Sequence, residues 1–266
     1  MGLIGGSFCK ALKGKFEIDG RDREEVLQAA LKDGAIGGAA KDLSLYDAVF
    51  LCVPPAAALD IIRKEKFKSG ALVADFCGVK REIVRAAEEK LPCCRYVGCH
   101  PMAGREVSGY GSSRESLFAK ASLIITVTEK TDWSGVEMVK AIAAEAGFSR
   151  FPVCSPEYHD AKIAYTSQLA HIVSNAYVKS EQAEEYAGFT GGSFQDMTRI
   201  AAVDEKLWSD LFIMNRDFLA KELDNLIVNL NGYLDALKSG EGERLAGLLA
   251  EGKRIKNSFF KSGFKN

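Results

Sequence analysis

The sequence predicts a doubly wound parallel α/β sheet followed by an all-α domain. In the first half of the 266-residue chain, short apolar runs alternate with segments of helical periodicity. This alternation is typical of parallel strands joined by right-handed crossover helices. After Pro156 the strand pattern stops, and leucines recur at helical spacing up to Leu237. We therefore expect two domains, over residues 1–153 and 154–266.

Six segments of the first half are expected to be strands. The clearest is 48–53, a continuous apolar run that ends at Pro54 and Pro55, as in a strand buried on both faces. A second buried run covers 71–75. The remaining expected strands are 16–20, 96–99, 122–128 and a last one near Phe151.

Helices are expected between these strands and throughout the second half. Apolar residues at helical spacing predict a helix over 23–33. Further helices of the first half are expected over 56–64, 81–90 and 133–146. In the second half we expect helices over 158–182, 207–237 and 244–260, with Gly232 as a mild interruption of the second.

Composition and charge exclude several classes of function. With 35 Lys and Arg against 36 Asp and Glu, the net charge of −1 offers no electrostatic footprint for nucleic acid or an anionic membrane surface. No uncharged apolar run reaches the length of about 18 residues that a membrane-spanning helix needs. The apolar part of the first ten residues is too short for a secretory signal.

Cysteine usage indicates a reducing compartment. The seven cysteines are an odd number and show no C-x-x-C spacing, so neither a zinc site nor a disulfide framework is expected. Several lie inside apolar runs, where a reduced cysteine behaves as a small core residue. We expect a cytoplasmic protein without a bound metal.

The first residues, Gly2 to Ser7, carry a glycine-rich signal for a dinucleotide. Gly2 and Gly5 fit the second and third glycines of G-x-G-x-x-G, which lets backbone approach a pyrophosphate at a helix N-terminus. Asp22 follows an expected strand, where a carboxylate binds a ribose 2′-hydroxyl and repels a 2′-phosphate. NAD is therefore favoured over NADP, although the neighbouring Arg21 and Arg23 weaken this preference.

The strand that should precede this glycine-rich turn has no counterpart in the sequence. It would be the central strand of a doubly wound sheet, and its loss would exceed a domain's usual stability of about 5–15 kcal/mol. We expect either that roughly ten N-terminal residues are absent or that the start codon is misassigned. The alternative is a chain that begins at Met1 and holds a dinucleotide poorly.

His100 is the first candidate for chemistry. It directly follows an expected strand, and the carboxyl edge of a parallel sheet faces the ligand crevice. A neutral imidazole there can take a proton from an alcohol while a hydride leaves for nicotinamide. The alternative is a surface-loop histidine.

Further candidates lie in the helical half. Ser167 and His171 share one helix face, as a substrate contact or as a core histidine at a helix contact. For His159, next to Asp160 at the start of that helix, capping and packing is the preferred interpretation.

Arg199 follows a glycine pair and could bind a substrate carboxylate or pair with Asp196. Trp208, beside Leu207 and Leu211, is more often a core or interface residue than a substrate wall.

Taken together, five stretches resemble the prephenate/arogenate dehydrogenase family of tyrosine biosynthesis, and the resemblance covers essentially the whole chain. The stretches are Gly2–Ser7, Asp75–Lys80, Gly98–Gly104, Ser167–His171 and Asp196–Ala201. The family joins a Rossmann-type nucleotide-binding domain to a helical dimerisation domain. Its members are NAD(P)-dependent dehydrogenases that act on a CH–CH donor with decarboxylation. A hydride passes from C4 of prephenate to NAD, the hydroxyl proton goes to a histidine, and ring CO2 leaves to give 4-hydroxyphenylpyruvate.

The resemblance implies roles for individual residues. His100 would take the C4 hydroxyl proton, and Arg199 would bind a substrate carboxylate. The other expected substrate contacts are His171, Gln168, Glu106 at the site entrance, and Trp208 near the neighbour's cleft of a homodimer. The expected cofactor contacts are Gly2, Leu3, Ile4, Gly5, Asp22, Val53, Pro54 and Gly78.

Three departures from the family pattern stand out. Gly78 occupies a position where many members carry serine, so hydroxyl assistance to His100 is lost or comes from water. Gln168 and Ala170 interrupt the pattern Ser-His-Leu-Pro-His, so the role of its first histidine does not transfer. The chain ends at Asn266 without a regulatory ACT-type domain or a fused chorismate mutase, so feedback control through either is not expected.

Alternative functions remain open from the sequence. The substrate could be arogenate, although Arg105 and His171 favour prephenate. A dehydrogenase of the 3-hydroxyacid type would need a lysine on the inter-domain helix, but Lys162 and Lys179 lie off the Ser167/His171 face. A non-catalytic relative truncated at its N-terminus is a third possibility.

Overall fold

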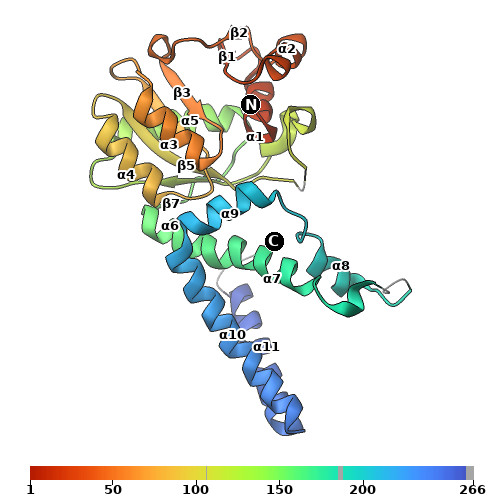
Figure 1. Cartoon of the computed structure of the whole chain (residues 1–266). Coiled ribbons are helices and arrows are strands. Elements are labelled where there is room, and N and C mark those ends of the chain that lie inside the picture. Colours follow the sequence, from red (N-terminus) through yellow and green to blue (C-terminus); the bar gives the residue numbers. More distant parts are fainter. Residues whose placement is uncertain (106, 185–187, 262–266) are drawn as a thin grey trace. The chain divides into compact units, whose positions relative to one another are not determined.

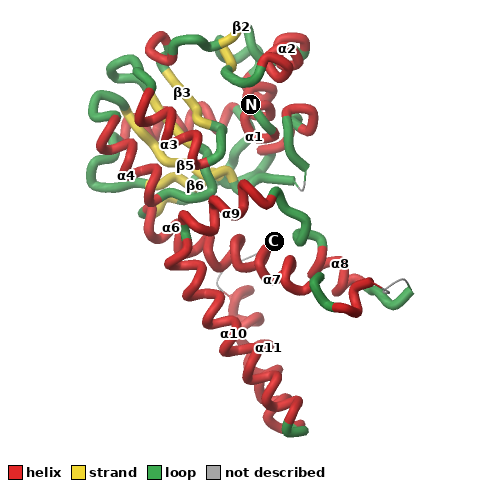
Figure 2. The backbone as a smooth tube through the Cα atoms, in the orientation of Figure 1, coloured by secondary structure: helices red, strands yellow, loops and turns green. Residues whose placement is uncertain are grey.

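The computed structural model describes residues 1–105, 107–184 and 188–261 (Figure 1). By their internal contacts these form two compact units, divided between Arg216 and Asp217. Within these described ranges, all strands precede residue 155, and the described residues after it are in helices or loops (Figure 2). The predicted domain boundary at 153/154 coincides with this change but lies inside the first unit, so it stays a prediction.

The main sheet has five strands in the order β3-β4-β5-β6-β7. Their bounds are Ala48–Leu51, Leu72–Asp75, Arg95–Pro101, Leu123–Thr126 and Val153–Cys154. Strands β3, β4 and β5 are parallel, as are β6 and β7. Because they are parallel, the carboxyl ends of β3, β4 and β5 meet at one edge of the sheet.

The prediction of a wholly parallel sheet is wrong for one pair, because β6 runs antiparallel to β5. The connection between these two strands contains only the 3-10 turns Tyr110–Ser112 and Glu115–Phe118 among its described residues. A parallel return needs a crossover that packs back on the sheet, which in this class is a helix. Helix α5 (Trp133–Glu145) supplies such a crossover between β6 and β7, and that pair is parallel.

A separate two-stranded parallel sheet lies near the N-terminus. It pairs β1, Asp19–Gly20, with β2, Gly38–Ala39. The strand predicted over 16–20 is thus confirmed only in its last two residues. Helix α1 (Leu3–Leu12) precedes β1, and helix α2 (Glu24–Lys32) connects β1 to β2.

Helices cover both faces of the main sheet, which confirms the doubly wound architecture. Leu72 and Ala74 of β4 point into a core shared with α1 and α5, whereas Val73 points into a core shared with α3 (Pro55–Lys64) and α4 (Arg81–Lys90). Each of these three β4 side chains is fully buried. Alternate residues of one strand therefore fill opposite cores, as the period of two requires.

The helical part differs from the prediction at two breaks. The segment expected as one helix over 158–182 is α6, Pro156–Ile163, a π-helical turn, Ala164–Gln168, and α7, Leu169–Tyr177. The long helix expected over 207–237 is divided at Asn215 into α9, Glu205–Met214, and α10, Arg216–Lys238. The remaining helices are α8, Gly192–Thr198, and α11, Gly242–Lys261.

The second unit consists of most of α10 together with α11. The hydroxyl of Tyr233 donates to the carbonyl oxygen of Leu248 at 3.3 Å, so the two helices pack side by side. Gly232 lies next to Leu248, where a Cβ would make ordinary van der Waals contact at 3.9 Å. Across the described residues, no helix combines the length and apolar character that a bilayer crossing requires.

Candidate active site

The first turn of α1 lies between the carboxyl ends of β1 and β3. The amino group of Met1 contacts the Asp22 carboxylate beyond β1. A Cβ at Gly5 would lie only 3.0 Å from Cβ of Cys52, which follows β3. Glycine thus allows a close approach of helix to strand that a Cβ would crowd, which is the role of the third glycine in a dinucleotide-binding turn.

The N-terminus of α1 has the features of an anion-binding site. Its N-cap is Gly2, which provides no side-chain cap, and the first turn contains no acidic residue. A Cβ on Gly2 would meet nothing within 4 Å. The first N–H groups of a helix have no intrahelical acceptor, so those of Leu3, Ile4 and Gly5 are available to a phosphate.

The other predicted cofactor residues follow the ends of strands. Val53 and Pro54 follow β3, and Pro54 is the N-cap of α3. Asp22 accepts a hydrogen bond from the backbone N–H of Arg23 at 2.7 Å. Burial tends to raise the pKa of Asp22, but the bonds from the Met1 amino group and the Arg23 N–H outweigh it and keep the pKa below its usual value. Asp22 is therefore a charged acceptor at neutral pH.

His100 lies at the carboxyl end of β5, as expected from its position after an apolar run. Its Nε2 faces Gly78, in the loop after β4, where a Cβ would lie 3.8 Å away. The same Cβ would lie 3.4 Å from a methyl carbon of Leu211 on α9. Because residue 78 is glycine, space remains between the imidazole Nε2 and this apolar side chain.

A chain of hydrogen bonds leads from the other nitrogen of His100 into the protein. Nδ1 of His100 lies 2.9 Å from Nε2 of His159, and Nδ1 of His159 lies 2.7 Å from Oδ1 of Asp160. His159 and Asp160 are 2% and 1% exposed. The packing role preferred for His159 is therefore incomplete, because its ring joins His100 to a buried carboxylate.

Local sequence positions this pair. Ser155 is the N-cap of α6, its hydroxyl accepting from the backbone N–H of Tyr158 at 3.1 Å, and Pro156 occupies the first helical position. The helix start is thereby fixed three residues before His159. The signal that could have revealed the site is the His-Asp dipeptide in the first helical segment after the sheet.

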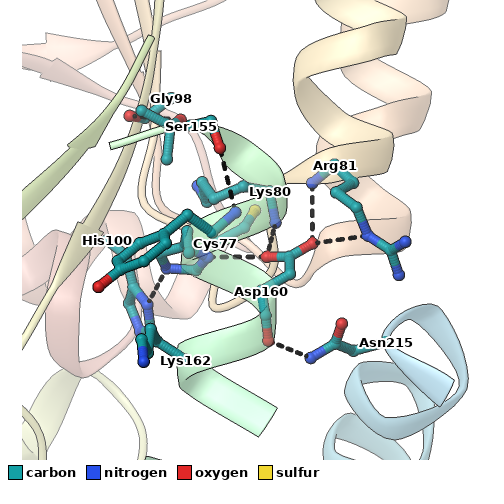
Figure 3. Close-up of polar contacts among 12 residues, drawn as sticks. Cys77, Lys80, Arg81, Gly98, His100, Ser155, Asp160, Lys162 and Asn215 are labelled. Carbon is teal, nitrogen blue, oxygen red and sulfur yellow. Dashed lines mark hydrogen bonds and ion pairs between the residues drawn. The ribbon is translucent and has the colours of Figure 1, made fainter. Parts of the chain in front are cut away.

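The Asp160 carboxylate caps helix α4 from outside that helix. Oδ1 accepts from the backbone N–H of Lys80 at 2.8 Å, and Oδ2 accepts from that of Arg81 at 2.9 Å (Figure 3). The Arg81 guanidinium adds an ion pair at 3.5 Å. The N-cap Lys80 provides no side-chain cap of its own, so Asp160 satisfies these exposed donors and lies at the positive end of the helix dipole.

A second buried network supports the strand that carries His100. The Lys80 ammonium, fully buried, contacts the Asp75 carboxylate and donates to the carbonyl oxygen of Cys99 at 2.5 Å. The Tyr96 hydroxyl donates to the other Asp75 oxygen at 2.6 Å. Removing one partner of such a buried pair would leave an uncompensated charge, so the network fixes the end of β5 relative to β4.

The environment keeps His100 neutral. Burial, together with the neighbouring His159 and the Lys80 ammonium, holds the pKa of His100 well below its usual range. Burial also lowers the pKa of His159, and the bond to Asp160 opposes this only in part. A neutral imidazole with an accessible nitrogen is the form that can accept a proton.

A second cluster contains His171, Trp208 and Arg199. The rings of His171 and Trp208 lie 3.8 Å apart, and Nδ1–H of His171 donates to the Ile200 carbonyl oxygen at 3.0 Å. Burial lowers the pKa of His171, and the positive charge of Arg199 lowers it further. These three residues, predicted separately from the sequence, form one basic and aromatic cluster.

Helix α9 connects the two clusters. Trp208 contacts His171, and Leu211, three residues later on the same helix, lies against Gly78 beside His100. Three residues correspond to about 4.5 Å along a helix axis. Helix α9 therefore carries one contact to each cluster.

The predicted substrate contact of Gln168 is not supported by its placement. The side chain is 1% exposed, its Nε2 donates to the Leu211 carbonyl oxygen at 3.3 Å, and its Oε1 accepts from Asn215 at 2.7 Å. Asn215 also donates to the Asp160 carbonyl oxygen at 2.9 Å. Both polar ends of Gln168 thus bind the π-helical turn to the end of α9, and Asn215 adds the bond to α6.

Two further predictions concern Glu106 and the absence of a metal site. Glu106 lies outside the described residues. Among the described residues, no group of three or more histidine, cysteine or acidic side chains is arranged to hold a metal.

Comparisons with known proteins bear on the whole chain. Residues 8–149 match the family model described as prephenate dehydrogenase, nucleotide-binding domain. Residues 155–251 match the model described as prephenate dehydrogenase, dimerization domain.

Individual relatives agree with these matches. The chain is 30% identical to prephenate dehydrogenase of Bacillus subtilis over 92% of its own length and 70% of the relative. It is 27% identical to cyclohexadienyl dehydrogenase of Zymomonas mobilis, over 92% and 89% of the two chains. Among solved structures it resembles prephenate dehydrogenase from Aquifex aeolicus in complex with hydroxyphenyl propionate and NAD+. The TM-score is 0.86 at 30% identity, with 97% and 95% of the chains covered.

Proposed function

Because the chain belongs to the prephenate dehydrogenase family, we propose that it oxidatively decarboxylates prephenate to 4-hydroxyphenylpyruvate with NAD. The observation that supports this most directly is the position of the His100 imidazole, with Nδ1 bonded to His159 and Nε2 toward Gly78. Burial lowers the pKa of His100 and so favours the neutral ring. Such a group accepts the proton of an alcohol that is being oxidised. Within this proposal, residues 1–153 bind the dinucleotide and 154–266 bind substrate and dimerise.

The residues at the sheet edge fit a dinucleotide. The N–H groups of Leu3, Ile4 and Gly5, which no side chain caps, suit a pyrophosphate, and the Asp22 carboxylate suits ribose hydroxyls. Val53, Pro54 and Gly78 follow the neighbouring strands. When bound, NAD accepts the hydride that leaves ring carbon C4. The charge on Asp22 disfavours a 2′-phosphate, so NAD is preferred to NADP.

His100 acts on the hydroxyl of the same carbon. As the C4 hydroxyl O–H bond breaks, its proton moves to Nε2 and the electron pair on oxygen forms the carbonyl. The bond from the ring to its carboxyl group then breaks, CO2 leaves, and that electron pair enters the ring. The carbonyl electron pair returns to oxygen, which takes a proton back from the His100 imidazolium to give the phenol. His100 thus serves first as the base and then as the acid.

Arg199 and His171 are proposed to bind the side-chain end of the substrate. A guanidinium forms charge-assisted bonds to a carboxylate. An amino group, as in arogenate, would want an acidic partner, whereas this end is made basic by Arg199 and carries a neutral His171. Arogenate is therefore the second candidate, and the keto acid prephenate is preferred. Seven free cysteines are typical of the reducing cytoplasm, where we place the reaction.

The test is formation of NADH by the purified chain. Prephenate and arogenate are compared in parallel, each with NAD and with NADP. The proposal expects the highest kcat/KM for prephenate with NAD and stoichiometric release of CO2. A higher kcat/KM for arogenate would exchange the two candidate substrates, and turnover of a 3-hydroxyacid in place of either would reject the reaction.

The pH profile provides a quantitative prediction. Because burial holds the pKa of His100 well below 6.5, the imidazole stays neutral as the pH falls from 7 to 6.5. We expect kcat/KM to be constant over this range and to fall tenfold per pH unit below the pKa of His100. Measurements between about pH 5 and 9, with a check that the chain stays folded, decide this. An acid limb with its midpoint at or above 6.5 would contradict the assignment.

We also propose that two copies associate through α10. Ile227, Leu230, Leu234 and Leu237 are each at least 45% exposed and follow the 3-4-3 spacing of a coiled-coil seam. Replacing Leu230 and Leu234 together by glutamate is expected to convert a dimer to a monomer in light scattering. The matched control, Asn229→Glu, adds charge off the seam and should stay dimeric. A double variant that remains dimeric would show that the seam is not the interface.

A further inference from the structure

We propose that His159 and Asp160 are positioning residues that hold His100 in the tautomer with its proton on Nδ1, which leaves Nε2 free as the base. The inference rests on the proposed role of His100. It adds that a buried histidine and a buried carboxylate, 59 residues further along the chain, decide which nitrogen of His100 reacts.

The argument starts at Asp160, which acts as an acceptor through both oxygens. Backbone N–H groups of Lys80 and Arg81 donate to Oδ1 and Oδ2, and a backbone N–H cannot reverse its role. The N-terminus of α4 and the Arg81 guanidinium add positive potential at the same oxygens. Asp160 is therefore a carboxylate, and Nδ1 of His159 must be the donor in the bond between them.

The proton positions then follow along the chain of bonds. Neutral His159 carries its single ring proton on Nδ1, so its Nε2 can only accept. The partner of that Nε2 is Nδ1 of His100 at 2.9 Å, which must therefore carry the proton of His100. The remaining nitrogen, Nε2, has a free electron pair, and it is the one that faces Gly78. The hydrogen-bond geometry, together with a neutral His159 whose pKa burial lowers, thus selects the productive tautomer.

The same bonds stabilise the charge that forms during the reaction. When Nε2 of His100 takes the hydroxyl proton, the resulting imidazolium donates through Nδ1 to His159, whose own ring is held by the Asp160 carboxylate. The ammonium of Lys80 opposes this positive charge, and the carboxylate of Asp75 beside it compensates. The Asp160 carboxylate thus orients the base as the aspartate of a catalytic triad does, but through one additional imidazole.

The glycine at position 78 makes this support more important. It brings no hydroxyl to Nε2 of His100, so substrate-side orientation by a side chain at that position is missing. Within the described part of the chain, the one hydrogen bond of the His100 ring joins its Nδ1, as donor, to Nε2 of His159. His159, which contacts Nδ1 on the side of the ring away from Nε2, therefore orients the base.

Tautomers can be read directly, without substrate or cofactor. The chain contains three histidines, so 15N-histidine labelling gives six ring nitrogens, and two-bond correlation spectra distinguish a protonated from an unprotonated nitrogen. We expect protons on Nδ1 of both His100 and His159. In Asp160→Asn, an amide N–H facing His159 shifts the proton of each ring to Nε2, while His171 stays unchanged as an internal reference.

Kinetics test the consequence for turnover. Asp160→Asn should lower kcat about 10- to 100-fold with little change in KM, because the wrong nitrogen of His100 is then protonated. His159→Leu should cause a similar loss. In His159→Gln the side-chain oxygen can still accept from Nδ1 of His100. The fall in log kcat for this variant should be at most half of the fall for His159→Leu.

A matched control separates positioning from general destabilisation. Thr126→Val removes a buried hydrogen bond to the Gly98 carbonyl on the same strand β5 and leaves the histidines untouched. It should lower the melting temperature but keep kcat and all tautomers. If Asp160→Asn does not fold, the comparison of His159→Leu with His159→Gln tests the inference instead. A His100 proton on Nε2 in the unmodified chain, or equal kcat for the Leu and Gln variants, would overturn the inference even if prephenate is turned over.

Discussion

Replacement of His100 by asparagine is expected to lower kcat about 1000-fold while KM for prephenate changes less than about threefold. The asparagine side chain ends near the former Nδ1 and can keep a bond to His159, but it has no atom at the position of Nε2. General-base catalysis contributes about 10²- to 10⁴-fold in enzymes, and the loss of an interaction made mainly in the transition state appears in kcat. Initial rates of NADH formation against prephenate concentration measure both parameters.

The pH profile of the residual activity adds a second readout for this variant. Since the group that titrates is gone, the acid limb of kcat/KM should disappear. Thr126→Val again serves as the folding control. A His100→Asn enzyme with turnover within tenfold of the unmodified chain would remove His100 from the mechanism and would also withdraw the basis for a positioning role of His159.

Replacement of Arg199 by alanine is expected to raise KM for prephenate about 10- to 100-fold and to leave kcat nearly unchanged. A hydrogen bond to a charged group contributes about 1.5–3 kcal/mol, and each 1.4 kcal/mol corresponds to a factor of ten. The bond from Arg199 to a carboxylate is present before and during the reaction, so its loss affects binding uniformly. Arg199→Lys should lie between the two, because it keeps the charge but not the fork.

The pKa of His171 provides a second measurement of the effect of Arg199→Ala. The positive charge of Arg199 lowers the pKa of His171, so Arg199→Ala should raise that pKa in a 15N-histidine titration. Lys206→Ala on α9 provides a matched loss of one exposed cation and should alter neither KM nor this titration. If KM held steady in Arg199→Ala, the carboxylate would have to be bound elsewhere.

The order of elements follows from sequence periodicity because the physics is local. A helix with one apolar face and a strand with apolar residues throughout bury different surfaces, and the run 48–53 and the helix 81–90 were recognisable on that ground. The position of His100 at the sheet edge follows from the same logic, because parallel strands end together. A glycine that admits Cys52 is likewise implied by its spacing in the turn.

Errors arose where the outcome depends on elements far apart in the chain. The antiparallel direction of β6 depends on the path of the segment that connects β5 to β6. The residues within the two strands do not determine that path. The break at Asn215 and the burial of Gln168 depend on where α6, the π-helical turn and α9 meet. The sequence pattern of a polar residue on a helix face is the same whether the side chain contacts solvent, substrate or another amide.

Local patterns along the chain predict the two-part architecture, the glycine turn and the histidine at the end of β5. The partners of that histidine depend on how distant elements pack against one another. His159 and Asp160 read as helix-start residues until α6 brings them against β5 and the N-terminus of α4. The physical reason is that a hydrogen bond depends on position to within a few tenths of an ångström, whereas periodicity fixes only which face of an element is buried.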